Sequence, residues 1–255
     1  MKIRILGCSG AEVPRANHPS YLIDGKILLD AGTIGAALRK DQQWRIRHIL
    51  LTHAHLDHIK GIPFLADNII INEKNHHITL VSKLRILHAL RRSLLNNIVW
   101  PDFTKIPDPE NPVIRFKLIG AGIPTDINGY TVTAYSVSHG MPSVGFLVED
   151  NKGKRLLYTG DTGPTDTIWK SLRGTKIHGL IIEASFPNKM KEMAIKSGHL
   201  TPRLLKAELK KLGTPPERIF ITHCKPRYKA EIKKEIKRLG FNNIEILKDG
   251  QVIEL

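Results

Sequence analysis

The sequence contains little cysteine: Cys8 and Cys224 are the only two among 255 residues. Two distant cysteines make neither a disulfide framework nor a Cys-x-x-Cys motif, so a reducing cytoplasm is the simpler expectation. No apolar run approaches the roughly 18–20 residues that a membrane-spanning helix needs. The opening segment Met1–Gly7 is interrupted by glycine too early for a signal peptide. We therefore expect a soluble, cytoplasmic chain with no membrane partner.

No internal repeat, low-complexity segment or linker divides the chain. Hydrophobic residues make up 41% of it, which is ordinary for a globular protein and sufficient for a sizeable core. A length of 255 residues is compatible with one α/β sandwich or barrel. We therefore expect a single domain over residues 1–255.

Acidic residues are scarce relative to basic ones, and the formal net charge is +15. Between Arg203 and Arg238 there are twelve lysines or arginines and four glutamates, on segments that have the pattern of amphipathic helices. One interpretation is a solvated basic face. The other is long-range attraction of an anionic substrate or of RNA. Charge alone does not choose between them.

Apolar runs bounded by turn residues predict buried or half-buried strands. These runs cover residues 3–6, 20–23, 27–29, 47–52, 114–118, 130–136, 145–149, 155–158, 177–183 and 218–222. Helical spacing predicts helices over residues 34–40, 82–97, 202–212 and 229–239. In the second of these helices Lys83, Arg85, Arg91 and Arg92 are expected to face mostly away from the core. The proline-rich residues 101–112 exclude regular structure, so residues 82–112 are interpreted as a helical and proline-rich insertion near the active site.

The clearest chemical signal is the segment Thr52-His53-Ala54-His55-Leu56-Asp57-His58, directly after an apolar strand. Three imidazoles and a carboxylate this close together converge only if the loop wraps a cation, since burying them unpaired is costly. These ligand types suit zinc, iron or manganese. The alternative is an exposed polar loop without a metal.

Three further metal-ligand types each follow a predicted strand. His139 lies in Ser136-Val137-Ser138-His139-Gly140, Asp161 in Tyr158-Thr159-Gly160-Asp161-Thr162, and His223 in Phe220-Ile221-Thr222-His223. Together with the histidine-rich loop, this order resembles the HxHxDH signature and later motifs of the metallo-β-lactamase superfamily. The resemblance implies an α/β fold, a four-layer αββα sandwich with a metal site at one edge of two facing sheets.

The resemblance also implies two divalent metal ions, with zinc expected first and iron or manganese as alternatives. One ion would be held by His53, His55 and His139. The other would be held by Asp57, His58 and His223, and Asp161 would bridge the two ions. Attack by a metal-bound hydroxide is the reaction that such a site supports in the superfamily.

Glu183 and His199 narrow the chemistry further. In Ile181-Ile182-Glu183-Ala184-Ser185 and Ser197-Gly198-His199-Leu200-Thr201 they resemble the Glu–His pair of the phosphodiesterase branch, which includes the tRNA 3′-processing endonucleases (tRNase Z). A histidine held by a carboxylate can protonate a poor alkoxide leaving group. The resemblance therefore implies His199, Glu183 and Asp57 as catalytic residues. The structural alternative is that Glu183 caps an element and His199 only begins a helix.

The phrases Phe186-Pro187 and Leu200-Thr201-Pro202 look most like class II cyclic-nucleotide phosphodiesterases, whereas Gly61-Ile62-Pro63 is closer to tRNase Z. We therefore expect hydrolysis of 3′,5′-cyclic nucleotides such as cyclic AMP or cyclic GMP, with Trp100 and Phe103 as substrate-binding residues that stack on the base. A tRNase Z-like endoribonuclease is the alternative, and a non-catalytic RNA-binding protein on the same fold comes third. RNA as a partner and a homodimer both stay open.

Overall fold

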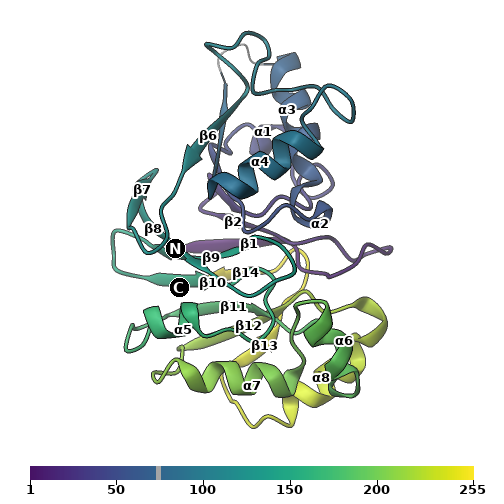
Figure 1. Cartoon of the computed structure of the whole chain (residues 1–255), viewed down its shortest axis with the longest axis vertical. Coiled ribbons are helices and arrows are strands. Elements are labelled where there is room, and N and C mark those ends of the chain that lie inside the picture. Colours follow the sequence, from purple (N-terminus) through teal and green to yellow (C-terminus); the bar gives the residue numbers. More distant parts are fainter. Residues whose placement is uncertain (73–75) are drawn as a thin grey trace.

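Two mixed seven-stranded sheets lie face to face in the computed structural model, which describes residues 1–72 and 76–255 (Figure 1). The strands of the first sheet are, in order, β14 (Val252–Glu254), β1 (Lys2–Gly7), β2 (Ser20–Ile23), β3 (Ile27–Leu29), β4 (His48–Leu50), β5 (Ile78–Ser82) and β6 (Ile114–Leu118). Those of the second sheet are β13 (Ile244–Ile246), β12 (Arg218–Thr222), β11 (Gly179–Glu183), β10 (Arg155–Tyr158), β9 (Val144–Glu149), β8 (Tyr130–Ser136) and β7 (Thr125–Ile127).

Both sheets follow one plan, in which three antiparallel pairs lie on one side of the sheet and three parallel pairs on the other. In the first sheet the change comes at β3, which is antiparallel to β2 and parallel to β4. In the second sheet it comes at β10, which is antiparallel to β9 and parallel to β11. Parallel neighbours have their carboxyl ends at the same edge, so the loops that leave them gather there.

Helices cover the outer face of each sheet (Figure 1). The helices beside the first sheet are α1 (Lys40–Gln43), α2 (Leu56–Ile59), α3 (Gly61–Asn72) and α4 (Leu84–Ser93). Those beside the second sheet are α5 (Thr167–Ser171), α6 (Lys191–Lys196), α7 (Pro202–Lys211) and α8 (Lys229–Lys237), with short 3₁₀ turns at Asn188–Met190 and Pro226–Tyr228. The expected four-layer αββα sandwich is confirmed. Within the residues described, no helix has the length and apolarity to cross a membrane.

Both faces of the strands are buried in the core, which explains why their sequences are continuous apolar runs. Successive side chains of a strand point to opposite faces. In β9, Phe146 and Val148 join the cluster between the two sheets, whereas Leu147 joins the cluster under α5 and α7. In β12, Phe220 faces the other sheet and Ile221 faces the helices. Because both faces are covered, both sets of positions are apolar.

Each predicted strand corresponds to an observed one within about two residues. The helix predicted over residues 82–97 is shorter, since α4 ends at Ser93. The helix predicted over residues 34–40 is wrong: turns occupy residues 35–37, and α1 begins only at Lys40. Gly32 and Gly35 disfavour a helix there. The position of Gly32 is also fixed by packing, because a Cβ on it would lie 1.9 Å from the backbone oxygen of Asp57.

Candidate metal centre

Four of the expected ligands lie in the loop after β4, which one buried carboxylate fixes. Asp30 accepts hydrogen bonds from the backbone N–H and the hydroxyl of Thr52, both at 2.8 Å. His55 then precedes α2 in an extended conformation, with φ −68° and ψ 147°. The single helical turn that follows brings Asp57 and His58 back beside the other ligands.

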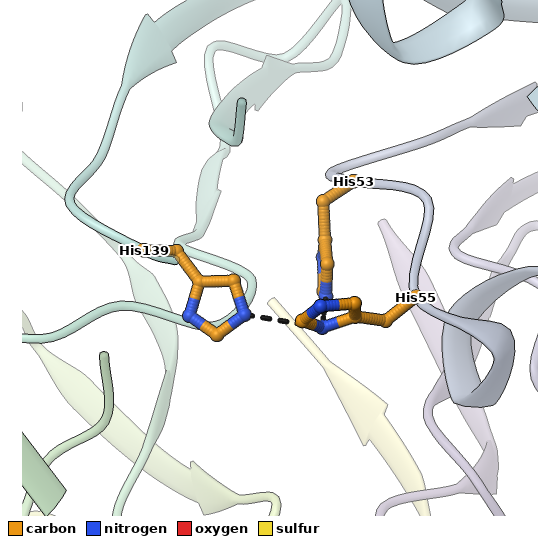
Figure 2. A group of neighbouring side chains, drawn as sticks. All are labelled: His53, His55 and His139. Atoms are coloured by element: carbon orange, nitrogen blue, oxygen red, sulfur yellow. Dashed lines mark hydrogen bonds between the residues drawn. The ribbon is translucent and has the colours of Figure 1, made fainter. Parts of the chain in front are cut away.

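Three histidines form the first cluster (Figure 2). His55 Nδ1 lies 3.1 Å from His53 Nε2 and 3.2 Å from His139 Nε2. The far nitrogens are already used, because His53 Nδ1 donates to Thr52 Oγ1 and His139 Nδ1 donates to the Gly198 carbonyl, each at 2.9 Å. Two lone pairs therefore point at His55, whose one proton could satisfy only one of them. A cation between the three rings resolves this conflict.

In the second cluster, too, one nitrogen of each imidazole is hydrogen-bonded and the other faces the site. His58 Nδ1 donates to Asp30 Oδ2 at 2.7 Å, and its Nε2 is buried without a hydrogen-bond partner. The Ser185 hydroxyl donates to Glu183 at 2.6 Å, so it accepts from His223 Nδ1 at 2.9 Å. The Nε2 atoms of both imidazoles are thereby left as lone pairs that face the site.

Asp161 lies between the two clusters. Its Oδ2 is 3.3 Å from His223 Nε2, 3.4 Å from His58 Nε2 and 3.9 Å from His53 Nε2. Asp57 Oδ2 approaches only the second cluster, at 3.2 Å from His223 Nε2 and 3.8 Å from His58 Nε2. Asp161 thus occupies the position that a carboxylate shared by two metal ions would need.

The pKa shifts in the cluster follow from burial and from the carboxylates that face the imidazoles. Burial lowers the pKa of His53 well below its ordinary value, which leaves a neutral ring able to ligate a metal. Burial also opposes charge on His58, but Asp161 and Asp30 outweigh it and raise its pKa well above the ordinary value. Burial alone would raise the pKa of Asp161, but His223 and His58 hold it well below the usual range. A divalent ion would supply the charge that these carboxylates demand.

The donor set fits a dinuclear metal site. The potential ligand atoms form overlapping groups in which all atoms lie within 4.8 Å of one another. The groups are His53–His55–His139, His53–His58–Asp161, Asp57–His58–His223 and Asp161–His199–His223. All seven expected ligands are among these residues. Imidazole and carboxylate together suit zinc, iron or manganese and do not by themselves select one metal.

Glu183 and His199 are in direct contact at the same site. His199 Nδ1 donates to Glu183 Oε1 at 2.7 Å, and Glu183 is fully buried. The carboxylate also accepts from the backbone N–H of Thr162 at 2.9 Å and of Leu200 at 3.1 Å, besides the Ser185 hydroxyl. Glu183 therefore has two contacts that matter. It anchors two loops through their backbone N–H groups, as the structural interpretation expects, and it holds the His199 ring, as the chemical interpretation expects.

The other side of the His199 ring faces the metal ligands. Its ring stacks on that of His223, with centroids 5.3 Å apart and an interplanar angle of 22°. Burial lowers the pKa of His199, but Glu183 outweighs burial and the pKa is raised above its ordinary value. His199 therefore holds a proton more readily than an ordinary imidazole does, in contact with the ring of the metal ligand candidate His223.

The two aromatic residues expected to bind substrate are placed differently. Phe103 is 3% exposed and lies in the core cluster, so it has no free face for stacking on a base. Trp100 is partly buried and meets Phe64 edge to face, with ring centroids 5.2 Å apart. We therefore retain only Trp100 as a candidate wall of a substrate pocket.

Sequence reasoning missed the residues that orient the ligands. Asp30 is fully buried and accepts from Thr52, His58 and the hydroxyl of Tyr158, the last at 2.7 Å. Its only signal in the sequence is an acid directly after the apolar strand Ile27–Leu29. Ser185, which orients His223, gives no signal by itself.

The backbone is strained or tightly packed at several residues of the candidate metal centre. His223 has φ 58°, a left-handed conformation that costs energy in a non-glycine residue and is frequent at functional sites. Gly10 passes so close that a Cβ there would lie 2.4 Å from the His223 carbonyl oxygen. Gly198, at φ 71°, similarly leaves room for His139, whose Nδ1 would be 2.9 Å from a Cβ at that position.

The fold and the clustered histidines and aspartates define a metal-dependent hydrolase. Residues 26–224 match the beta-lactamase superfamily domain, and the chain belongs to the metallo-β-lactamase superfamily. Solved structures of the same fold include unliganded yeast PDE1, at TM-score 0.83 and 17% identity over 100% of this chain and 99% of that chain. The short form of human tRNase Z matches at TM-score 0.70 and 22% identity, over 100% and 99% of the two chains.

Relatives in sequence have two different names. A probable 3′,5′-cyclic-nucleotide phosphodiesterase of Yersinia pestis is 28% identical over 223 residues, and the match covers 78% of this chain and 62% of the relative. The chain thus spans less than two thirds of that protein. A ribonuclease Z of Bradyrhizobium diazoefficiens is 27% identical over 305 residues, covering 97% of each chain. A ribonuclease Z of Haloarcula marismortui is 23% identical, covering 98% of this chain and 95% of the relative.

Proposed function

We propose that this protein is a phosphodiesterase that hydrolyses 3′,5′-cyclic nucleotides. The observation that carries the proposal is the buried Glu183–His199 pair, which stands against the metal ligand cluster. Opening a cyclic phosphodiester expels a sugar alkoxide, and an alkoxide leaves readily only when it receives a proton. A lactam or thioester hydrolase has less need of such an acid.

In this proposal the site residues have two roles: seven hold the metal ions, and the Glu183–His199 pair handles the proton. His53, His55 and His139 would hold one ion, Asp57, His58 and His223 the other, and Asp161 both. The ions, when bound, would supply an activated water and neutralise charge on the phosphoryl oxygens. His199 delivers its proton to the leaving oxygen, and Glu183 keeps the ring oriented and stabilises its charged form.

The cyclic nucleotide as substrate rests on two supports. One is the sequence relative named as a probable 3′,5′-cyclic-nucleotide phosphodiesterase. The other is a pair of exposed apolar side chains close in sequence to site residues, which we assign to contact with a nucleobase. Leu56, next to His55, is 62% exposed, and Met193 on α6, six residues before His199, is 51% exposed. Trp100 is the aromatic residue that we assign to the wall of the substrate pocket.

A ribonuclease Z-like endonuclease is the second candidate. It is favoured by relatives of that name that align over nearly the whole chain, and by the net charge of +15. The chemistry of the site is common to both candidates, so only the substrate separates them.

His199→Ala tests the observation behind the proposal. Loss of the acid should lower kcat for cyclic AMP by about 10²–10⁴-fold, while the metal content is unchanged. The loss should be much smaller for bis(p-nitrophenyl) phosphate, because p-nitrophenolate leaves without a proton. Glu183→Gln should show the same pattern more weakly, since Glu183 positions the His199 ring and does not itself donate the proton. Equal losses on both substrates, or loss of metal, would contradict the acid role.

A further inference from the structure

A second concave surface lies along α4, and it shares no lining residue with the metal centre. Helix α4 and the segment after it enclose a groove of about 840 Å³. Basic side chains dominate its lining: Arg85, His88, Arg91, Arg92 and Lys105. Asp102 is the one carboxylate among the lining residues.

The helical period gathers these cations on one face. Ile86, Leu87 and Leu90 of α4 are buried against the first sheet, which turns the opposite face outward. Arg85 and Arg92 are seven residues apart and therefore lie on the same side of the helix. Lys105 comes from the loop that runs back beside the helix, so the groove has basic walls from two segments.

One arginine is neutralised and the others are not. Arg91 Nε donates to Asp102 Oδ2 at 3.4 Å, and Asp102 is also held by the backbone N–H of Thr104 at 3.1 Å. Across residues 1–72 and 76–255, no ion pair or side-chain hydrogen bond involves the charged groups of Arg85, Arg92 or Lys105. Like charges held together on one face repel one another, and an anion between them would relieve that repulsion.

The lining also specifies the kind of anion. A guanidinium matches the oxygens of a phosphate with two parallel hydrogen bonds, which favours phosphate over smaller anions. No Phe, Tyr or Trp side chain lines the groove, so it lacks the large rings on which nucleic-acid-binding proteins usually stack bases. We propose that this groove binds inorganic polyphosphate, whose successive phosphate groups the guanidinium and ammonium groups would contact at once.

The triple variant Arg85→Gln, Arg92→Gln, Lys105→Gln removes the three unpaired cations and keeps Arg91. Binding is measured on metal-loaded protein with two probes: sodium tripolyphosphate by calorimetry, and a fluorescein-labelled 12-nucleotide RNA by anisotropy, with a gel to show that the RNA stays intact. Loss of three phosphate contacts should weaken binding at least about tenfold and lower the salt slope of log K by about 2.

A matched control removes the same charge from another basic groove. Lys233, Lys237 and Lys248 line a cleft of about 610 Å³ between α8 and β13. Lys233→Gln, Lys237→Gln, Lys248→Gln should change either affinity less than about threefold. Loss of tripolyphosphate binding in the α4 variant supports the proposal, and a loss confined to RNA overturns it in favour of a nucleic-acid backbone. Unchanged binding of both probes, or equal losses in the two triple variants, overturns the proposal.

Discussion

The two halves of the metal centre are built to different depths. In the outer half only His53 is fully buried: His55 is exposed, and His139 is partly buried and oriented by a backbone carbonyl. Asp57 is the partly exposed ligand of the inner half. In the inner half His58 and His223 are fully buried. Their outer nitrogens are held by side chains, those of Asp30 and Ser185.

The buried ligands belong both to the metal centre and to the core of the fold. The inner half belongs to the core, so its ligands and their partners also contribute to folding. The outer half is assembled from loops on the two sheets, which the backbone hydrogen bond from Val144 to Thr52 joins at 2.9 Å. Loss of a fully buried ligand such as His58 should therefore affect both stability and metal binding, whereas loss of the exposed His55 should affect metal binding alone.

Asp161→Ala should have the largest effect, because it removes the carboxylate that approaches ligands of both halves. Protein purified without chelator should contain about two metal equivalents, and the variant should lose a large part of both. Activity should fall by about 10³-fold or more, the worth of several kcal/mol of charge stabilisation. Metal analysis and kcat on one preparation check this. Full metal and full activity in the variant would show that Asp161 bridges nothing.

The contrast between the halves is tested by His58→Ala and His55→Ala in the presence of chelator. Without His58, the buried Asp30 and Asp161 lose a partner, which costs about 3 kcal/mol. For a chain of this size, that should lower Tm by roughly 6 °C or more. The exposed His55 should shift stability by no more than about 0.5 kcal/mol. Thermal unfolding curves that coincide for the two variants would remove the distinction between the halves.

Trp100→Ala should have the smallest effect. If its ring forms a wall for the base, KM for cyclic AMP should rise by about three- to tenfold, the worth of one stacking contact, with kcat nearly unchanged. KM for bis(p-nitrophenyl) phosphate, which has no nucleobase, serves as the control. An equal rise for both substrates would indicate a change in the scaffold and not a lost contact with the base.

The ligands were predictable because metal chemistry leaves a dense pattern. Three histidines and an aspartate within six residues, followed by single ligand types after later strands, seldom occur together without a metal to bind. The supporting residues leave no such pattern. Asp30 resembles any acid that ends a strand, and only the fold shows that it touches both Thr52 and His58.

The helices were less predictable than the strands. Ile34, Ala36, Ala37 and Leu38 give helical spacing, but tight packing of Gly32 against the loop of Asp57 imposes turns there. Conversely, no helix is predicted from the sequence over Gly61–Asn72, where α3 lies with Pro63 near its start. Proline is tolerated in the first turn, where its missing N–H has no partner to lose.

The central claim is that the metal centre and the Glu183–His199 pair act on a small cyclic phosphodiester. The most direct measurement gives one metal-loaded preparation cyclic AMP, cyclic GMP and a tRNA precursor in parallel. We expect turnover of a cyclic nucleotide to its monophosphate. The KM should rise only modestly between 50 and 200 mM salt, because the substrate presents one phosphate to the protein. Cleavage of the tRNA precursor at its 3′ end, without turnover of either cyclic nucleotide, would contradict it and establish the endonuclease.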